Sequence, residues 1–196
     1  MLKAEIRSIV KIERQKISES ALTELSTLVS KNVTSRFDLG GKTISIFLPI
    51  AKFKELNTFL LIDSLKKNET IRIAVPVSNF QDQSLKHYEL NNDIQIELNN
   101  YGIPEPINGN IEIKNMEFDI VFVPLLAFNN EGYRVGYGKG FYDRFLKKCN
   151  KKCLFIGLNL FDHPVIIEDT NEFDIQLHYC VTPNYLYNFH KVETPR

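Results

Sequence analysis

The stretch "DIVFVPLLAF", from Asp119 to Phe128, decides the fold class. After the leading aspartate it contains no polar residue, and it is too short to cross a bilayer as a helix. A strand with one solvated face would alternate polar and apolar residues, whereas a continuous apolar run is typical of a central strand buried on both faces. The stretch therefore predicts a parallel sheet that is covered by helices on both sides.

The segments that precede this stretch extend the same pattern. Residues 42–49 ("KTISIFLP") and 70–76 ("TIRIAVP") are rich in β-branched and apolar residues and end at prolines, as strands do. Between them, residues 54–67 place leucine and phenylalanine at helical spacing. Strand, helix and strand in this order favour a parallel sheet. Residues 81–109 are less regular: "KHYEL" (86–90) favours a strand, and the turn-rich remainder favours an edge hairpin or a lid.

The two ends of the chain complete the prediction. Residues 1–37 carry apolar side chains at helical spacing, so we expect two helices in a hairpin, the second capped by Ser18 or Ser20. Later in the chain we expect a helix over 140–149, a strand over 153–161 and a last strand over 178–183. The expected fold class is α/β: one domain over residues 1–196 with a three-layer α/β/α Rossmann-like fold, a mostly parallel central sheet and an N-terminal helical hairpin.

The bulk composition excludes several classes of function. With 24 basic and 24 acidic side chains the net charge is zero, which gives no long-range attraction to nucleic acid or anionic membranes. Three cysteines without a CxxC spacing and four scattered histidines indicate neither a disulfide framework nor a zinc site. The charged N-terminal segment is unlike a signal peptide. We therefore expect a cytoplasmic monomer that acts on small molecules, without a nucleic-acid or membrane partner.

The stretch "GYRVGYGKGFYDRF", residues 132–145, holds four of the nine glycines and lies between the buried strand and a predicted helix. Ligands of open α/β sheets bind at this edge, and glycines let the backbone approach them. Lys139 provides a mobile charge and Arg134 a forked one for phosphate oxygens, while Asp143 could bind the magnesium of a nucleoside triphosphate. The spacing matches neither the dinucleotide GxGxxG nor the Walker A loop. From the residues alone, a turn with solvated charges is the alternative.

Residues 123–146, "VPLLAFNNEGYRVGYGKGFYDRFL", closely resemble the signature segment of 5-formyltetrahydrofolate cyclo-ligases, also called methenyltetrahydrofolate synthetases. Weaker matches follow in order along nearly the whole chain, in "KAEIR" (3–7), "FLPIAKFKELNT" (47–58), "GIPEP" (102–106) and "EFDIQLHYCVTP" (172–183). The resemblance implies an enzyme that uses ATP and Mg²⁺ to convert 5-formyltetrahydrofolate into 5,10-methenyltetrahydrofolate, releasing ADP and phosphate. In the family's mechanism the formyl oxygen attacks the γ-phosphorus, which turns that oxygen into part of a leaving group.

The resemblance also implies a role for each matching residue. Catalysis is implied for Lys139 and Arg134. ATP binding is implied for the first helix and the glycine stretch, namely Lys3, Arg7, Arg134, Gly136, Gly138, Lys139, Gly140, Phe141 and Tyr142. Folate binding is implied for Ile50 (or Leu48), Glu55, Tyr137, Gly138, Lys139, Gly140 and Phe141. The implied metal ligands are Asp143 and Asp174.

Three other positions need a separate interpretation. Lys11 lies one helical turn beyond the implied ATP ligands, and we interpret it as a surface residue. Asn129 stands where the family usually has an acid, which puts a carboxylate role there in doubt. Phe173 precedes Asp174 where many members have histidine. Neither departure involves the cations of the glycine stretch.

Two other classes of function stay open. A non-catalytic regulatory protein of the same fold would bind folate or nucleotide without turnover. A relative of sugar-phosphate isomerases or acyl-transferases would work without ATP, since similar sheets host those activities. The family positions of Glu55, Arg134, Lys139 and Asp143 favour the cyclo-ligase over both.

Overall fold

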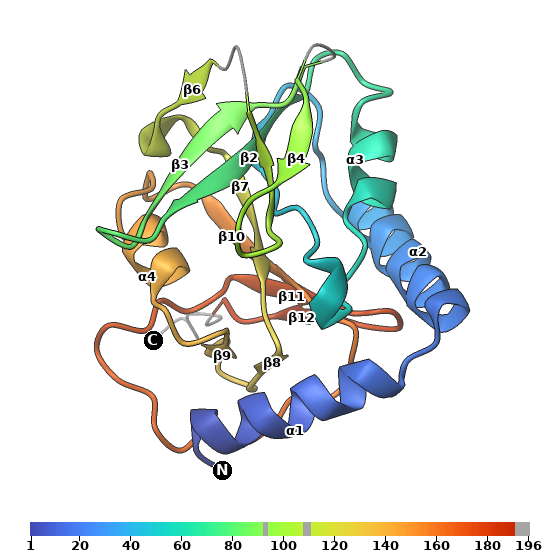
Figure 1. The fold of residues 1–196 in the computed structure, drawn as a ribbon, viewed down its shortest axis with the longest axis vertical. Helices are drawn as coiled ribbons and strands as arrows, with labels where there is room; N and C mark the ends of the chain where they lie inside the picture. The colour runs from blue at the N-terminus through green and yellow to red at the C-terminus, as the bar shows by residue number, and fades with distance from the viewer. Residues whose placement is uncertain (92–93, 108–110, 191–196) are drawn as a thin grey trace, which may run out of the picture.

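The computed structural model describes residues 1–91, 94–107 and 111–190. Within them, an eight-stranded mixed sheet forms the middle layer, in the order β12-β11-β10-β7-β1-β2-β3-β6 (Figure 1). Its five central strands run parallel to one another: β11 (Tyr179–Val181), β10 (Leu154–Leu158), β7 (Ile120–Pro124), β1 (Thr43–Ser45) and β2 (Arg72–Asn79). The prediction of a mostly parallel central sheet is confirmed.

Antiparallel strands finish both edges of the sheet. Beside β2 lie β3 (Ser84–Glu89), which covers most of the strand expected over 86–90, and β6 (Glu112–Ile113). At the opposite edge, β12 (Leu186–Asn188) pairs with β11. The predicted strand over 178–183 is confirmed by β11, but the prediction that it is the last strand was wrong. With three residues, β12 is too short to show the period of two by which a strand is recognised.

Strand β7 is the centre of the molecule, and its side chains build the core on both faces. Ile120 and Phe122 belong to one apolar cluster, and Val121 and Val123 to the other, because successive side chains of a strand alternate. All four are at most 2% exposed. The continuous apolar run is thus explained by burial on both faces.

Four α-helices occur among the described residues: α1 (Lys3–Lys16), α2 (Glu19–Arg36), α3 (Phe59–Leu65) and α4 (Phe141–Leu146). Helices α2 and α3 cover one face of the sheet and α4 covers the other, which confirms the three layers (Figure 1). Short 3₁₀ turns occur at η1 (Ala51–Phe53) and η2 (Asn115–Glu117).

Helices α3 and α4 are shorter than expected. The helix predicted over 54–67 begins only at Phe59, because Lys54 takes a left-handed conformation (φ 44°, ψ 51°) that no helix continues through. The helix predicted over 140–149 ends at Leu146. The amides of Lys148 and Cys149 bond three residues back, so the chain tightens into turns there.

The first two helices meet at a corner instead of packing as the expected hairpin (Figure 1). Ile17 leaves the helical region (φ −69°, ψ 127°), and Ser18 caps α2 by accepting a hydrogen bond from the amide of Ala21 at 3.2 Å. Helix α2 packs against α3 and β11, while α1 contacts η1 and β9. The corner thus places α1 across the carboxyl edge of the sheet rather than on its face.

Two small hairpins stand apart from the central sheet. The apolar run leaves the sheet at Pro124, which has no amide hydrogen for further pairing, and returns as β8 (Ala127–Phe128) against β9 (Arg134–Val135). The prediction of one strand up to Phe128 was therefore wrong.

The second hairpin consists of β4 (Ile96–Leu98) and β5 (Pro104–Pro106). This confirms the hairpin alternative for the irregular region, although its predicted end at 108–109 lies outside the described residues. Across the part of the chain that is described, no helix is long and apolar enough to cross a membrane.

Candidate functional site

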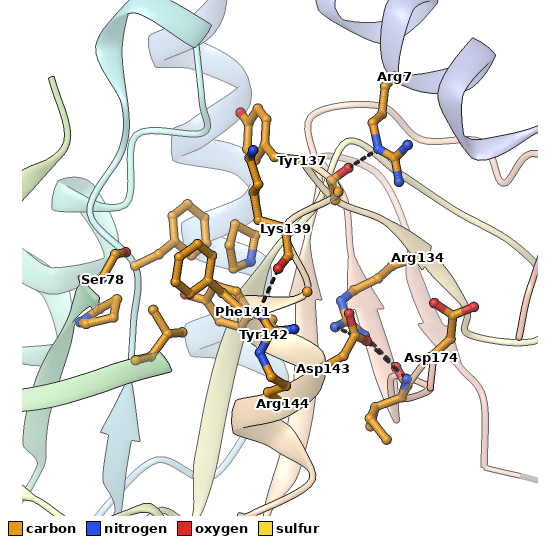
Figure 2. Close-up of a pocket in the computed structure, with 18 of the residues that line it drawn as sticks. Arg7, Ser78, Arg134, Tyr137, Lys139, Phe141, Tyr142, Asp143, Arg144 and Asp174 are labelled. Atoms are coloured by element: carbon orange, nitrogen blue, oxygen red, sulfur yellow. Dashed lines mark hydrogen bonds and ion pairs between the residues drawn. The ribbon is translucent and has the colours of Figure 1, made fainter. Parts of the chain in front are cut away.

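A cleft of about 980 Å³ opens at the carboxyl edge of the sheet, where the strand order reverses between β1 and β7. Its walls come from the segments after β1, β2 and β7, from α1, from residues 169–175 and from residues 132–140, which we call the glycine loop (Figure 2). Open α/β sheets bind ligands at this point. The volume is at the upper end for small-molecule pockets, which suits two ligands side by side.

Three residues of the glycine loop have a left-handed backbone that favours glycine. Gly132 and Gly138 have φ +86° and Gly140 has φ +68°. A Cβ on Gly138 would lie 3.1 Å from Cζ of Arg7. Around Gly136 the corresponding space is open, and its carbonyl accepts a 2.8 Å hydrogen bond from Nε of Arg7. The absence of side chains therefore lets α1 lie directly against the loop.

The two cations implied in catalysis lie in different environments. Lys139 is exposed at the cleft, and its ammonium makes no ion pair with any residue that the structure describes (Figure 2). Arg134 is only 8% exposed: Nη2 donates to Oδ1 of Asp143 at 2.7 Å, and Nη1 donates to the carbonyl of Ile175. Lys139 is free to move with a phosphate. Arg134 is held in the cleft wall by its two hydrogen bonds, and its remaining N–H groups can donate to a ligand.

Three basic residues of α1 line the cleft at four-residue spacing: Lys3, Arg7 and Lys11. Nζ of Lys3 lies 2.5 Å from Oδ2 of Asp174. The Lys11 ammonium lies 5.6 Å from the centre of the Tyr137 ring, within the range of a cation–π contact. The interpretation of Lys11 as a surface residue is confirmed, because its side chain is exposed, and it lies at the cleft.

The two implied metal ligands lie close together, and each is already paired. Oδ1 of Asp143 accepts from Arg134 and, at 3.2 Å, from the amide of Ile175, the neighbour of Asp174. Asp174 is held by Lys3. The other oxygen of each carboxylate has no contact with a described residue.

The donor set fits one kind of metal ion. Among the described residues there is no group of three or more His, Cys, Asp or Glu side chains that could hold a metal. Two carboxylates with one available oxygen each suit Mg²⁺, which takes one or two carboxylates and completes its shell with phosphate oxygens and water. They do not suit a metal bound by the protein alone.

Glu55 is a buried carboxylate in the segment between η1 and α3, with 5% exposure. Its Oε2 accepts a 2.7 Å hydrogen bond from the amide of Ile50, and Tyr137 also hydrogen-bonds to it. Burial raises the pKa of Glu55, against the lowering effects of Tyr137, the Ile50 amide and Arg14. Both Leu48 and Ile50 line the cleft, so both candidates for the apolar wall are present.

Arg14 is a buried cation that sequence reasoning missed. It lies in the last turn of α1, is 3% exposed and donates from Nη2 to the carbonyl of Leu125 at 2.6 Å. Nη1 donates to the hydroxyl of Tyr137 at 3.4 Å. Within the described chain, Nε has no hydrogen-bond partner. The signal in the sequence was the basic spacing of α1, which Arg14 continues three residues after Lys11.

The Tyr142 hydroxyl is a second group that lacks a partner. Tyr142 lines the cleft, and its hydroxyl is buried without a hydrogen bond to any described residue (Figure 2). Burial and the charge of Glu55 raise the pKa of Tyr142, so the hydroxyl keeps its proton. Leaving such a group unpaired costs about 1–3 kcal/mol. A ligand or a water in the cleft would complete it.

Aromatic rings at the mouth of the cleft were also missed in part. Phe80, just after β2, lies 5.4 Å from Phe141 and 4.3 Å from Tyr101 between ring centres. Of these, only Phe141 carries a sequence prediction. The signal for Phe80 was its position at the carboxyl end of a predicted strand, the same edge as the glycine loop.

The two departures from the family pattern have local explanations. The side-chain oxygen of Asn129 accepts from the amides of Glu131 and Tyr133 and closes the turn between β8 and β9. Asn129 does not line the cleft. Phe173 lines the rim and is 70% exposed.

Comparison with known proteins gives a consistent family. The sequence model described as the 5-formyltetrahydrofolate cyclo-ligase family matches residues 1–166. The chain is 32% identical over 137 residues to the 5-formyltetrahydrofolate cyclo-ligase of Mycoplasma genitalium, covering 65% of this chain and 80% of the relative. For the enzyme of that name from Haemophilus influenzae, the identity is 30% over 152 residues, covering 74% and 71%.

A solved structure shares the fold over the full length of the chain. The structure titled 5,10-methenyltetrahydrofolate synthetase of Aquifex aeolicus superposes with a TM-score of 0.80 at 26% identity. The superposition covers 100% of this chain and 97% of that one.

Proposed function

Because the chain belongs to the 5-formyltetrahydrofolate cyclo-ligase family, we propose that its cleft closes 5-formyltetrahydrofolate to 5,10-methenyltetrahydrofolate at the expense of ATP, releasing ADP and phosphate. The observation that supports this site is that one cleft holds both Lys139 of the glycine loop, which makes no ion pair with a described residue, and the buried carboxylate of Glu55. The lysine suits a phosphate, and the carboxylate suits a flat ligand with paired N–H donors.

The chemistry explains why a folate enzyme needs a phosphate site. The formyl oxygen of the amide cannot leave as oxide. In the proposed sequence it bonds to the γ-phosphorus of ATP, and the bond from that phosphorus to the ADP oxygen breaks. Nitrogen 10 then bonds to the activated carbon and loses its proton, and the carbon–oxygen bond breaks to release phosphate. The protein mainly positions the reactants and stabilises charge on the phosphoryl oxygens.

We assign the phosphate end of ATP to the glycine loop and to the basic face of α1. Lys139 contacts the transferred phosphoryl group, because it is the cation that can move. Arg134 uses its remaining N–H groups toward the phosphates while it holds the wall. The other ATP contacts proposed are Lys3, Arg7, Gly136, Gly138, Gly140, Phe141 and Tyr142.

Asp143 and Asp174 are the carboxylates that would hold Mg²⁺. When bound, the ion neutralises charge on the phosphate oxygens. Arg134 and Lys3 each occupy one oxygen of these carboxylates and keep the other directed away from themselves.

We assign the pterin end of the folate to Glu55. A carboxylate can accept two parallel N–H donors, as the pterin offers. Ile50 supplies an apolar wall, and Tyr137 and Phe141 lie beside the flat ring with the loop backbone of Gly138 to Gly140.

One assay tests the proposal. Purified protein with 5-formyltetrahydrofolate, ATP and Mg²⁺ is expected to form the methenyl chromophore with one ADP released per turnover. Omitting ATP must stop the reaction, which separates this enzyme from an isomerase or acyl-transferase. Ligand binding without absorbance change or ADP release would instead support the regulatory protein. That the enzyme acts as a cytoplasmic monomer stays a prediction, which cell fractionation and size-exclusion chromatography test.

A further inference from the structure

Arg14 occupies a place behind the cleft that joins three segments distant in sequence. From the last turn of α1 it reaches the carbonyl of Leu125 after β7 and the hydroxyl of Tyr137 in the glycine loop. Tyr137 in turn hydrogen-bonds to Glu55. Arg14 and Glu55 also line the same small void behind the cleft. The arginine is therefore linked to the buried carboxylate through one tyrosine.

The burial of Arg14 requires an explanation, because a helix end could place a cation in water at no cost. A buried guanidinium is unfavourable unless it is paired and hydrogen-bonded. One of its N–H groups has no partner, and none of the ion pairs in the described structure involves it. The opposite charge that acts on Arg14 is the Glu55 carboxylate.

The charge of Glu55 depends on its surroundings from three sides. Tyr137 from the glycine loop, the Ile50 amide from the residue before η1 and Arg14 from α1 each lower its pKa. Tyr142 on α4 lies in the field of the same carboxylate. The two tyrosines are neutral, because burial and the charge of Glu55 raise the pKa of each. Burial also raises the pKa of Glu55, and Arg14 is the cation that opposes this. A protonated Glu55 could not accept two N–H donors.

We propose that Arg14 is a positioning residue: acting through Tyr137, it holds the Glu55 carboxylate ionised and directed at the ligand, and so sets the affinity for the pterin end of the folate. This inference rests on the proposed role of Glu55. It gives the enzyme a substrate-binding determinant outside the glycine loop and outside the cleft lining, on the helix that also carries the proposed ATP contacts Lys3 and Arg7.

A purely structural role makes a different prediction. If Arg14 only anchored α1 to Leu125, its removal would loosen the helix that also carries Lys3 and Arg7, and the KM for ATP would rise with the KM for folate. If it acts on Glu55, the two Michaelis constants separate. The pH dependence moves as well, because Glu55 then ionises only at higher pH.

The experiment compares Arg14→Gln with Lys16→Gln, which removes a charge from an exposed side chain in the same helical turn. KM for 5-formyltetrahydrofolate, KM for ATP and kcat are measured from pH 6 to 8.5, with the enzyme-free rate subtracted. For Arg14→Gln we expect the folate KM to rise about 10-fold at pH 7, with the ATP KM within twofold. The acid limb of kcat/KM for folate should move to higher pH, as expected when an opposite charge is removed. Lys16→Gln should behave as wild type.

Two further variants keep the inference testable if Arg14→Gln folds poorly. Tyr137→Phe deletes only the bridging hydroxyl and should raise the folate KM in the same direction. Arg14→Lys keeps the charge, so its acid limb should stay near that of wild type while the folate KM is intermediate.

The outcomes separate this inference from its premise. An unchanged folate KM in both Arg14→Gln and Tyr137→Phe, or an equal rise in both Michaelis constants, would overturn the role of Arg14. A wild-type folate KM in Glu55→Gln would overturn the role of Glu55. A wild-type protein that forms no methenyl product would overturn the proposed function itself.

Discussion

The glycine loop and the network around Glu55 lie in one cleft but solve opposite electrostatic problems. The loop presents an exposed lysine without a partner, on backbone that only glycine adopts comfortably. The network buries a carboxylate and surrounds it with Ile50, Tyr137 and Arg14. We expect the exposed lysine to move with the phosphate that it binds, whereas the buried carboxylate is held in place before the flat, neutral ring binds. The comparison predicts that changes in the loop affect turnover and that changes in the network affect substrate affinity.

The largest expected effect is on the loop side. Lys139→Ala should lower kcat by on the order of 100–1,000-fold, because a charge aimed at the transition state is lost. The fold should be unaffected, since the side chain is exposed. Methenyl absorbance and circular dichroism measure the two properties. Lys151→Ala, also exposed but absent from the cleft lining, serves as the control. Near-normal turnover in Lys139→Ala would remove the loop from catalysis.

His87 serves as a comparison for Glu55. We infer that Glu55 tolerates burial because it has hydrogen-bond partners, and His87 shows what burial costs a titratable group that lacks them among the described residues. Both ring nitrogens of His87 are buried without partners among the described residues, and burial lowers the pKa of His87 from its usual 6.5 to about 3. Between pH 6.5 and about 3, the unfolded chain therefore binds a proton at His87 that the folded chain does not bind. The free energy of unfolding falls as the pH falls through this range. The slope is about 1.4 kcal/mol per pH unit.

His87→Leu should remove this slope. Between pH 6.5 and 4.5 the wild type should lose about 2–3 kcal/mol more unfolding free energy than the variant. Urea unfolding at several pH values measures the difference. Parallel pH profiles for the two proteins would show that His87 has a partner after all.

Gly138→Ala separates backbone strain from contact with α1. The alanine must adopt φ +86° and lies 3.1 Å from the Arg7 guanidinium, so we expect the KM for ATP to rise about 10-fold. Gly41→Ala is the matched control, because Gly41 has φ +66° with open space around it. It should lose about 1 kcal/mol of stability with unchanged kinetics. Equal kinetics for both variants would assign the effect of Gly138 to strain alone.

The smallest expected effect belongs to Tyr142, a proposed ATP contact in the cleft wall. Tyr142→Phe removes the buried hydroxyl that lacks a partner, so unfolding free energy should stay equal or rise by about 1 kcal/mol. If the hydroxyl bonds to substrate, one KM should rise about fivefold, the loss of one hydrogen bond of about 1 kcal/mol. Thermal unfolding and steady-state kinetics measure both. A less stable variant with normal kinetics would mean that the hydroxyl has a structural partner.

The same contrast explains what the sequence could predict. The loop is contiguous, so its glycines and Lys139, with Asp143 just after them, stand out together in the sequence, as β7 does by its apolar run. The network combines Arg14, Ile50 and Tyr137, which meet only because α1 turns away from α2 at Ile17. Helical periodicity predicted both helices but carries no signal for the corner between them. For the same reason, the burial of Arg14 and the pairing of Arg134 with Asp143 could be known only from the fold.

The position of α1 also has a consequence in time. Helix α1 precedes the sheet in the sequence, yet its hydrogen-bond partners at the cleft are Leu125, Gly136, Tyr137 and Asp174. Each of these bonds joins residues that are 111 to 171 positions apart in the sequence. Contacts of such long sequence separation form late in folding. We expect the sheet to assemble first and the cleft to be completed last, so catalytic competence reports on the final step of folding.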